Sequence, residues 1–171
     1  DYLTSGGLWN SLNDEAEAIW SGLPEDQRTL VRRLLLSLVA IDEEQLLRRS
    51  IPHHSLDAEM AAAAEPLIAV RLLRREDGQL SIAHDALLTR WKRLRGWVEQ
   101  EDATLRIGRR IHMAARLWDE GGRSPEALLP IEAESWASWA ESDTSIMLSE
   151  SEREFISASV RHGLEERRRQ S

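Results

Sequence analysis

The pair Asp77-Gly78, flanked on both sides by short apolar segments, is the sequence feature that most constrains the fold of this chain. An Asp-Gly pair between apolar flanks is a strong signal for a tight β-hairpin turn. The apolar residues elsewhere mostly recur at three- and four-residue spacing, which is the period of an amphipathic helix. The sequence therefore predicts a mainly α-helical protein with one small hairpin.

Two helices are predicted before the first strand. Apolar residues recur with helical period over 8–23, and Pro24 ends that helix. The second helix runs from Pro24 to about Ala40, and its apolar arc is too wide for a surface helix, so we place it in the core. A short strand is expected around 46–51.

Two further helices are predicted between this strand and the hairpin. Asp57 is a residue type that caps helix N-termini, and Pro66 is expected to split the alanine-rich stretch into helices ending near Ala64 and Val70. The order helix, strand, helix, helix, strand, turn, strand is that of a winged helix, with the hairpin at Asp77-Gly78 as its wing.

An α-helical extension is predicted after the wing. A helical stripe runs from Leu87 to Val98, a helix spans about 103–120, and a short helix spans 132–140. Ser149 with Glu152 forms a capping box before the last helix. The predicted organisation is a helical lead-in, a winged-helix domain and a helical extension, over residues 1–23, 24–85 and 86–171.

Composition excludes several classes of function. The chain has no cysteine, which rules out disulfides, thiolate metal sites and a cysteine nucleophile. Its net charge of −8 argues against a general nucleic-acid binder. With neither a signal peptide nor an apolar run approaching the roughly 20 residues of a membrane span, we expect a cytoplasmic piece of a longer protein.

Most of the seven tryptophans fall on helical apolar stripes. Trp20, Trp91, Trp97 and Trp118 are expected in the core, and Trp136 and Trp139 are expected to anchor the short helix. One of these, or Trp9, could instead mark a surface that docks another domain, since tryptophan is enriched at interfaces.

His84-Asp85 lies where the second hairpin strand is predicted to become a helix. Asp85 occupies the expected N-cap position, where its carboxylate would accept from the N–H of Leu87 or Leu88 and contribute about 0.5–2 kcal/mol. Such a cap would aim His84, whose imidazole can donate a hydrogen bond to a phosphate. The alternative is structural: His84 packs under the wing and Asp85 only caps.

The string from Leu80 to Trp97, LSIAHDALLTRWKRLRGW, resembles the AHEALLRxWPRLRxW signature of bacterial STAND-type NTPases, the signal-transduction ATPases with numerous domains. Asp85 replaces the usual Glu and Lys92 the usual Pro. The Asp brings the site closer to the MHD motif of plant disease-resistance proteins and apoptosome-type ATPases, at the same winged-helix corner. The resemblance implies that His84 contacts the β-phosphate of ADP and holds the switched-off state.

Further short matches extend this resemblance along the chain, at Tyr2 with Gly6-Gly7-Leu8, Arg48-Arg49, Arg71-Leu72-Leu73, Ala115 to Trp118, and Phe155 to Ser159. We expect five arginines to contact a phosphate or a neighbouring domain: Arg48, Arg49, Arg71, Arg74 and Arg75.

No GxxxxGK[ST] loop is present, so we expect no catalytic residue, no ATP hydrolysis and no nucleotide bound by this chain alone. The resemblance implies an upstream P-loop domain holding ADP or ATP with Mg²⁺, a downstream repeat or membrane segment, and oligomers on activation. His53-His54 with Asp57 matches no standard metal-site spacing, so no metal site is expected. His112 and His162 are expected to be ordinary surface or boundary residues.

Three functions follow from these observations. The first is a non-catalytic regulatory module that senses the ADP or ATP state through His84 and relays it to downstream domains. The second is a winged-helix DNA-binding regulator, although 57–70 contains Asp57, Glu59 and Glu65 and no basic residue. The third is a protein-interaction scaffold without a nucleotide role.

Overall fold

The computed structural model describes residues 2–142 and 145–171, and for residues 2–10 it describes only the backbone. The side chains of Tyr2, Leu8 and Trp9 therefore lie outside the described part. The described residues form α1 Tyr2–Gly22, α2 Glu25–Ser37, β1 Val39–Asp42, β2 Gln45–Arg48, β3 Ile51–Pro52, the 3₁₀ turn η1 His53–Ser55, α3 Ala58–Ala69, β4 Leu73–Glu76, β5 Gln79–Ile82, α4 Ala86–Arg90, α5 Lys92–Gln100, α6 Asp102–Glu120, the 3₁₀ turn η2 Pro125–Ala127, α7 Pro130–Ser142 and α8 Glu150–Gln170.

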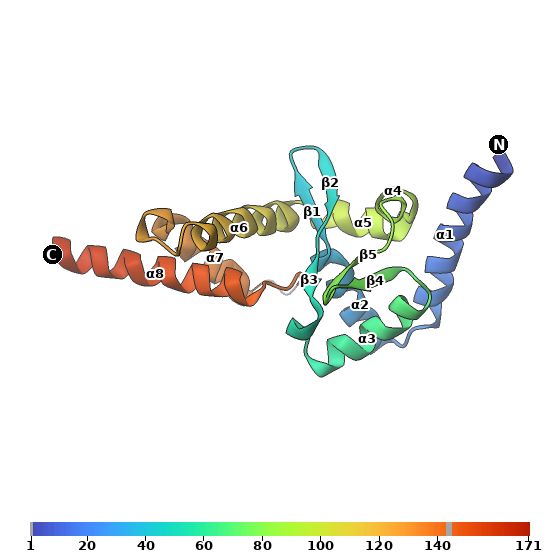
Figure 1. Cartoon of the computed structure of the whole chain (residues 1–171), viewed down its shortest axis with the longest axis horizontal. Coiled ribbons are helices and arrows are strands. Elements are labelled where there is room, and N and C mark those ends of the chain that lie inside the picture. Colours follow the sequence, from blue (N-terminus) through green and yellow to red (C-terminus); the bar gives the residue numbers. More distant parts are fainter. Residues whose placement is uncertain (1, 143–144) are drawn as a thin grey trace.

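The predicted fold class is confirmed, because the chain is mainly helical with small antiparallel hairpins (Figure 1). Strands β4 and β5 pair up to Glu76 and Gln79, leaving the predicted two-residue turn between them. Asp77 and Gly78 have φ values of 53° and 75°, and positive φ at both central residues is the mark of a type I′ turn. Strand β3 pairs with β5, and the resulting order β3-β5-β4 is consistent with a winged helix.

Helix α2 ends at Ser37, so its predicted extension to Ala40 is wrong. Val39 to Asp42 instead pair in antiparallel register with β2, which ends at Arg48. Leu38 to Ile41 form a continuous buried apolar run, and apolar periodicity alone does not separate a buried helix from a buried strand. The predicted strand over 46–51 is accordingly divided between β2 and β3.

Helix α3 passes through Pro66 without a break, so the predicted split near Ala64 is wrong. Pro66 removes one backbone donor, but it is solvent-exposed and lies only three residues before the last helical residue. The predicted cap at the other end is confirmed, since Oδ1 of Asp57 accepts the N–H of Met60 at 2.8 Å. The winged helix thus has the turn η1, not a second full helix, before α3.

Trp91 divides the predicted stripe of residues 87–98 into α4 and α5, because its backbone is extended, with ψ 102°. Two side chains of α1 support the break. Glu17 accepts the indole N–H of Trp91 at 2.9 Å, and Asn13 accepts the N–H of Lys92 at 3.1 Å. Helix α1 thereby packs onto the junction of α4 and α5 through polar as well as apolar contacts.

Two apolar cores organise the molecule. The first contains residues from each of the helices α1, α2, α3, α4 and α5 and from the wing, and it extends to Leu105 in α6. The second, which we call the C-terminal bundle, joins the rest of α6 to α7 and α8 through Ile111, Ala115, Trp118, Trp136, Phe155 and Ile156. Figure 1 shows this bundle extending away from the winged helix. The predicted boundaries at 23/24 and 85/86 stay predictions.

The tryptophans largely occupy the predicted core positions. Trp91, Trp97, Trp118 and Trp136 are buried, while Trp20 and Trp139 are partly buried. The predicted capping box is also confirmed, because Ser149 and Glu152 exchange side-chain and backbone hydrogen bonds at the start of α8. None of the helices within 2–142 and 145–171 has the length and apolar character needed to cross a bilayer.

Candidate functional site

The candidate site is the corner between β5 and α4, where His84 lies. The corner begins one residue after β5, where the N–H of Ala83 donates to the carbonyl of Leu72 at 3.0 Å. The imidazole of His84 is exposed and has no hydrogen-bond or ion-pair partner among the described residues. It is therefore available to a group from outside this chain, and the structural alternative of packing under the wing does not describe it.

Asp85 does not cap α4, and that prediction is wrong. Its backbone is already helical, with φ −55° and ψ −32°, whereas a capping residue has an extended backbone. The N–H groups of Leu87 and Leu88 donate instead to the backbone carbonyls of His84 and Asp85, at 3.1 and 3.0 Å. Since those donors are satisfied by the main chain, the carboxylate is left for another partner.

That partner is Arg48, the last residue of β2. Its Nε lies 2.6 Å from Oδ1 of Asp85, and its terminal nitrogen donates to the carbonyls of Ile82 at 2.9 Å and Ala83 at 3.4 Å. The carboxylate is largely exposed, so the ion pair itself adds little free energy. Its consequence is geometric, because one guanidinium holds the backbone before His84 and the side chain of the residue after it.

Arg71 lies beside this corner. It follows α3 and directly precedes Leu72, whose carbonyl accepts the N–H of Ala83, the residue before His84. Its φ is 66°, in the left-handed region that glycine prefers. Two hydrogen bonds, Leu72 N–H to Leu67 O at 2.9 Å and Arg71 N–H to Ile68 O at 3.0 Å, form the Schellman motif that fixes it there.

The guanidinium of Arg71 is exposed and, within the described ranges, has no partner. Arg74 and Arg75 differ, because Arg74 is paired with Glu76 and Arg75 lies 3.7 Å from Glu65. The corner therefore has two unpaired side chains with nitrogen donors, His84 and Arg71. A third such side chain, Arg48, already donates to backbone carbonyls.

Arg49 lies apart from the corner, in a buried ionic cluster. Its guanidinium donates to both carboxylate oxygens of Glu152, at 2.7 and 2.5 Å, and Nδ1 of His112 lies 3.2 Å from Oε2. The Glu152 side chain is only 1% exposed. Burial alone would raise its pKa, but hydrogen bonds from His112 and Arg49 and the charge of Arg49 outweigh burial and lower the pKa to about 2.

Sequence reasoning missed this cluster. Glu152 carried only the local signal of a capping box, and His112 was expected to be an ordinary boundary residue. No local pattern links either residue to Arg49, which lies 103 positions from Glu152 in the chain. His53, His54 and Asp57, the residues weighed as metal ligands, do not form a metal site. Within 2–142 and 145–171 no three His, Asp or Glu side chains are grouped so that they could hold an ion.

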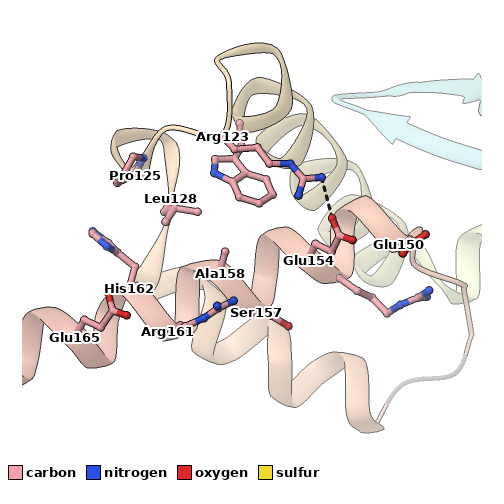
Figure 2. Close-up of a pocket in the computed structure, with 12 residues that line it drawn as sticks. Arg123, Pro125, Leu128, Glu150, Glu154, Ser157, Ala158, Arg161, His162 and Glu165 are labelled. Atoms are coloured by element: carbon pink, nitrogen blue, oxygen red, sulfur yellow. Dashed lines mark ion pairs between the residues drawn. The ribbon is translucent and has the colours of Figure 1, made fainter.

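A groove of about 790 Å³ lies in the C-terminal bundle, between the η2 region and α8. Figure 2 shows Arg123 reaching Glu154 at one end, with Pro125 and Leu128 facing α8. That ion pair measures 2.8 Å. Because three arginines and three glutamates line it, the groove has no net charge that would favour one class of ligand.

Comparison with known families decides what kind of protein carries this corner. The sequence model of the Novel STAND NTPase 1 family matches residues 1–126, out of 171 in the chain. The chain belongs to the Novel STAND NTPase 1 family. No curated protein and no solved structure gives a significant match.

The Novel STAND NTPase 1 match covers the elements that build the candidate site. It includes the winged helix, the corner at His84 and all of α6, and it stops within η2. Helices α7 and α8, which complete the second core, lie beyond it. The corner is thus part of the family region, whereas Glu152, the partner of Arg49, is not.

Proposed function

We propose that this chain is a non-catalytic regulatory module of a STAND-type signalling NTPase, and that it senses bound nucleotide at the His84 corner. The observation that carries the proposal is the exposed, unpartnered imidazole of His84 on a backbone held by Arg48. Because the backbone is already held, less conformational freedom is lost when this imidazole donates to a phosphate.

In this proposal the nucleotide is bound mainly by a P-loop domain upstream in the same cytoplasmic protein, as ADP or as ATP with Mg²⁺. His84 donates a hydrogen bond to the β-phosphate of ADP, and Arg71 supplies a second, charge-assisted one. A charge-assisted hydrogen bond contributes about 1.5–3 kcal/mol, which shifts a two-state equilibrium by about one to two orders of magnitude. ADP would then favour the closed arrangement, and its loss would free the module to signal downstream.

The direct test is the rate of ADP release from a protein that contains both the P-loop domain and this chain. We expect His84→Ala to accelerate release about 10- to 100-fold and to raise basal signalling. His54→Ala is the matched control, because His54 is also exposed and unpartnered among the described residues but lies in η1. Unchanged ADP release and unchanged output for His84→Ala would leave the interaction-scaffold function.

The DNA-binding alternative finds no support on α3, the helix that would enter the major groove. Its exposed charged residues are Glu59 and Glu65, and no basic residue occurs in it. A duplex-binding titration at several salt concentrations separates the two functions. Tight binding that weakens steeply with salt would favour DNA recognition over nucleotide sensing.

A further inference from the structure

We propose that Arg48 and Arg49 form a two-sided joint that couples the His84 corner to the start of α8. The coupling is a property of this chain; its use as a nucleotide relay rests on the proposed function. Occupancy at the corner would then change how firmly α8 is held, although α8 contributes no residue to the corner.

One side of the joint is Arg48. Through the carbonyls of Ile82 and Ala83 and the carboxylate of Asp85, its guanidinium contacts the corner before and after His84. A shift of this corner cannot preserve all three contacts unless Arg48 moves with it. The end of β2 is therefore tied to the position of His84.

The other side is Arg49. Successive residues of an extended chain point to opposite faces, so adjacent side chains at the end of β2 reach different parts of the molecule. The backbone N–H of Arg49 donates to the carbonyl of Leu38 at 2.8 Å, which holds this residue against the end of α2. Its guanidinium then reaches both oxygens of Glu152.

The contact between Arg49 and Glu152 affects α8 directly, because the same carboxylate stabilises the first turn of this helix. Its Oε1 accepts the N–H of Ser149 at 2.9 Å, while its own N–H donates to the hydroxyl of Ser149 at 3.1 Å. A displacement of Arg49 therefore weakens the partner that also closes the capping box. Since the pair is buried, water does not readily replace a lost contact.

Other links between the winged helix and the C-terminal bundle cross the same region, and two of them illustrate the background for the joint. The N–H of Met147 donates to the buried hydroxyl of Ser37 at 2.8 Å, and α6 passes through both cores. Neither link contacts the His84 corner. A test must therefore show that α8 responds to the loss of Arg48 and does not merely respond to general destabilisation of the winged helix.

Amide hydrogen exchange on the 171-residue chain provides that test. We expect Arg48→Gln to accelerate exchange near the start of α8, at residues 152–155, by about tenfold. Asp57→Ala is the control for general destabilisation, since it removes a cap from α3, at a cost of about 1 kcal/mol, without touching either arginine. An equal effect of the two variants on α8, or none from Arg48→Gln, would overturn the joint.

The reciprocal variant completes the experiment, because coupling between two places acts in both directions. We expect Glu152→Gln to accelerate exchange at Leu87 and Leu88 more than at Met60, the capped amide of α3, which reports the general loss of stability. Glu134→Gln, which breaks an exposed ion pair with Arg167 of α8, should leave all three amides unchanged. Arg49→Lys, which keeps the charge and loses the planar guanidinium, replaces Glu152→Gln if that variant does not fold. Changes confined to each variant's own contacts would overturn the proposal.

These outcomes are separate from the test of nucleotide sensing. His84 makes none of the joint's contacts, so His84→Ala can accelerate ADP release whether or not Arg48→Gln reaches α8. Conversely, a joint found by hydrogen exchange with no effect of His84→Ala would show mechanical coupling in a module that does not sense nucleotide.

Discussion

Nε of Arg48 lies 2.6 Å from Oδ1 of Asp85, so a strand residue engages the carboxylate that the local sequence assigns to the helix cap. The two aspartates at predicted helix starts therefore differ in role. Asp57 accepts a backbone N–H, and Asp85 accepts from a side chain.

This difference predicts unequal costs for the same substitution. Asp57→Ala should lower the free energy of unfolding by about 1 kcal/mol, because it removes a true cap. Asp85→Ala should cost about 0.5 kcal/mol or less, since its ion pair is largely exposed. Urea unfolding of both variants measures the difference, and equal losses would mean that Asp85 caps α4 after all.

The lowered pKa of Glu152 predicts that the free energy of unfolding falls at low pH. Its pKa is about 2 in the folded chain against an ordinary value of 4.5, so the unfolded state binds the proton more readily. The stabilisation is fully present above about pH 5 and is lost as the pH falls through about 2; its size is about 3 kcal/mol. Unfolding free energies of the native chain and Glu152→Gln should converge over that range.

Near neutral pH, Glu152→Gln should cost about 3–5 kcal/mol, because it leaves the guanidinium of Arg49 buried without its counter-charge. Glu134→Gln is the exposed comparison and should cost less than about 1 kcal/mol. A Glu152→Gln variant with native stability at pH 7 would contradict this account of the cluster.

Two helical glycines should respond to alanine in opposite ways. At Gly96 in α5 an added Cβ meets nothing within 4 Å, so Gly96→Ala should stabilise by about 0.5–1 kcal/mol through helix propensity. At Gly163 in α8 the Cβ would lie 2.9 Å from Cβ of Pro130, and the overpacking should outweigh that gain by about 1 kcal/mol. Thermal unfolding of the pair decides whether α7 and α8 pack as closely as described.

Two substitutions of Arg71 distinguish its effect on stability from its proposed role in sensing nucleotide. Arg71→Gly should raise the free energy of unfolding by about 1 kcal/mol, since glycine adopts the left-handed backbone without strain. In the protein with a P-loop domain, the same change should accelerate ADP release. Arg71→Ala keeps the strained backbone and should accelerate release without the gain in stability, so a stabilised Arg71→Ala would argue against strain at this position.

The features that the sequence predicted correctly are local. The Asp77-Gly78 turn, the Asp57 cap and the Ser149 and Glu152 capping box each depend on residues at most three positions apart. Helical periodicity located most helices for the same reason. It failed at Val39 and Ala40, where a continuous apolar run fits a buried strand as well as a helix.

The features that escaped prediction depend on distant partners. The order of strands and helices in the sequence predicted that His84 lies at the corner between β5 and α4. It did not predict that the imidazole has no partner among the described residues. Asp85 could not be separated from a cap without knowing that Arg48 reaches it, and Arg49 could not be assigned to Glu152 across 103 positions. Propensity describes one turn at a time, whereas an ion pair between elements depends on the completed fold.

Helix α6 connects the two apolar cores as one continuous helix. Its first turns pack into the winged-helix core through Leu105, and its later turns carry the C-terminal bundle through Ile111 and Trp118. At 1.5 Å per residue its 19 residues extend about 28 Å, so a tilt of about 10° at the base displaces the far end by about 5 Å. A small rotation where α6 enters the winged-helix core would therefore displace the far end of this helix by nearly the length of one helical turn.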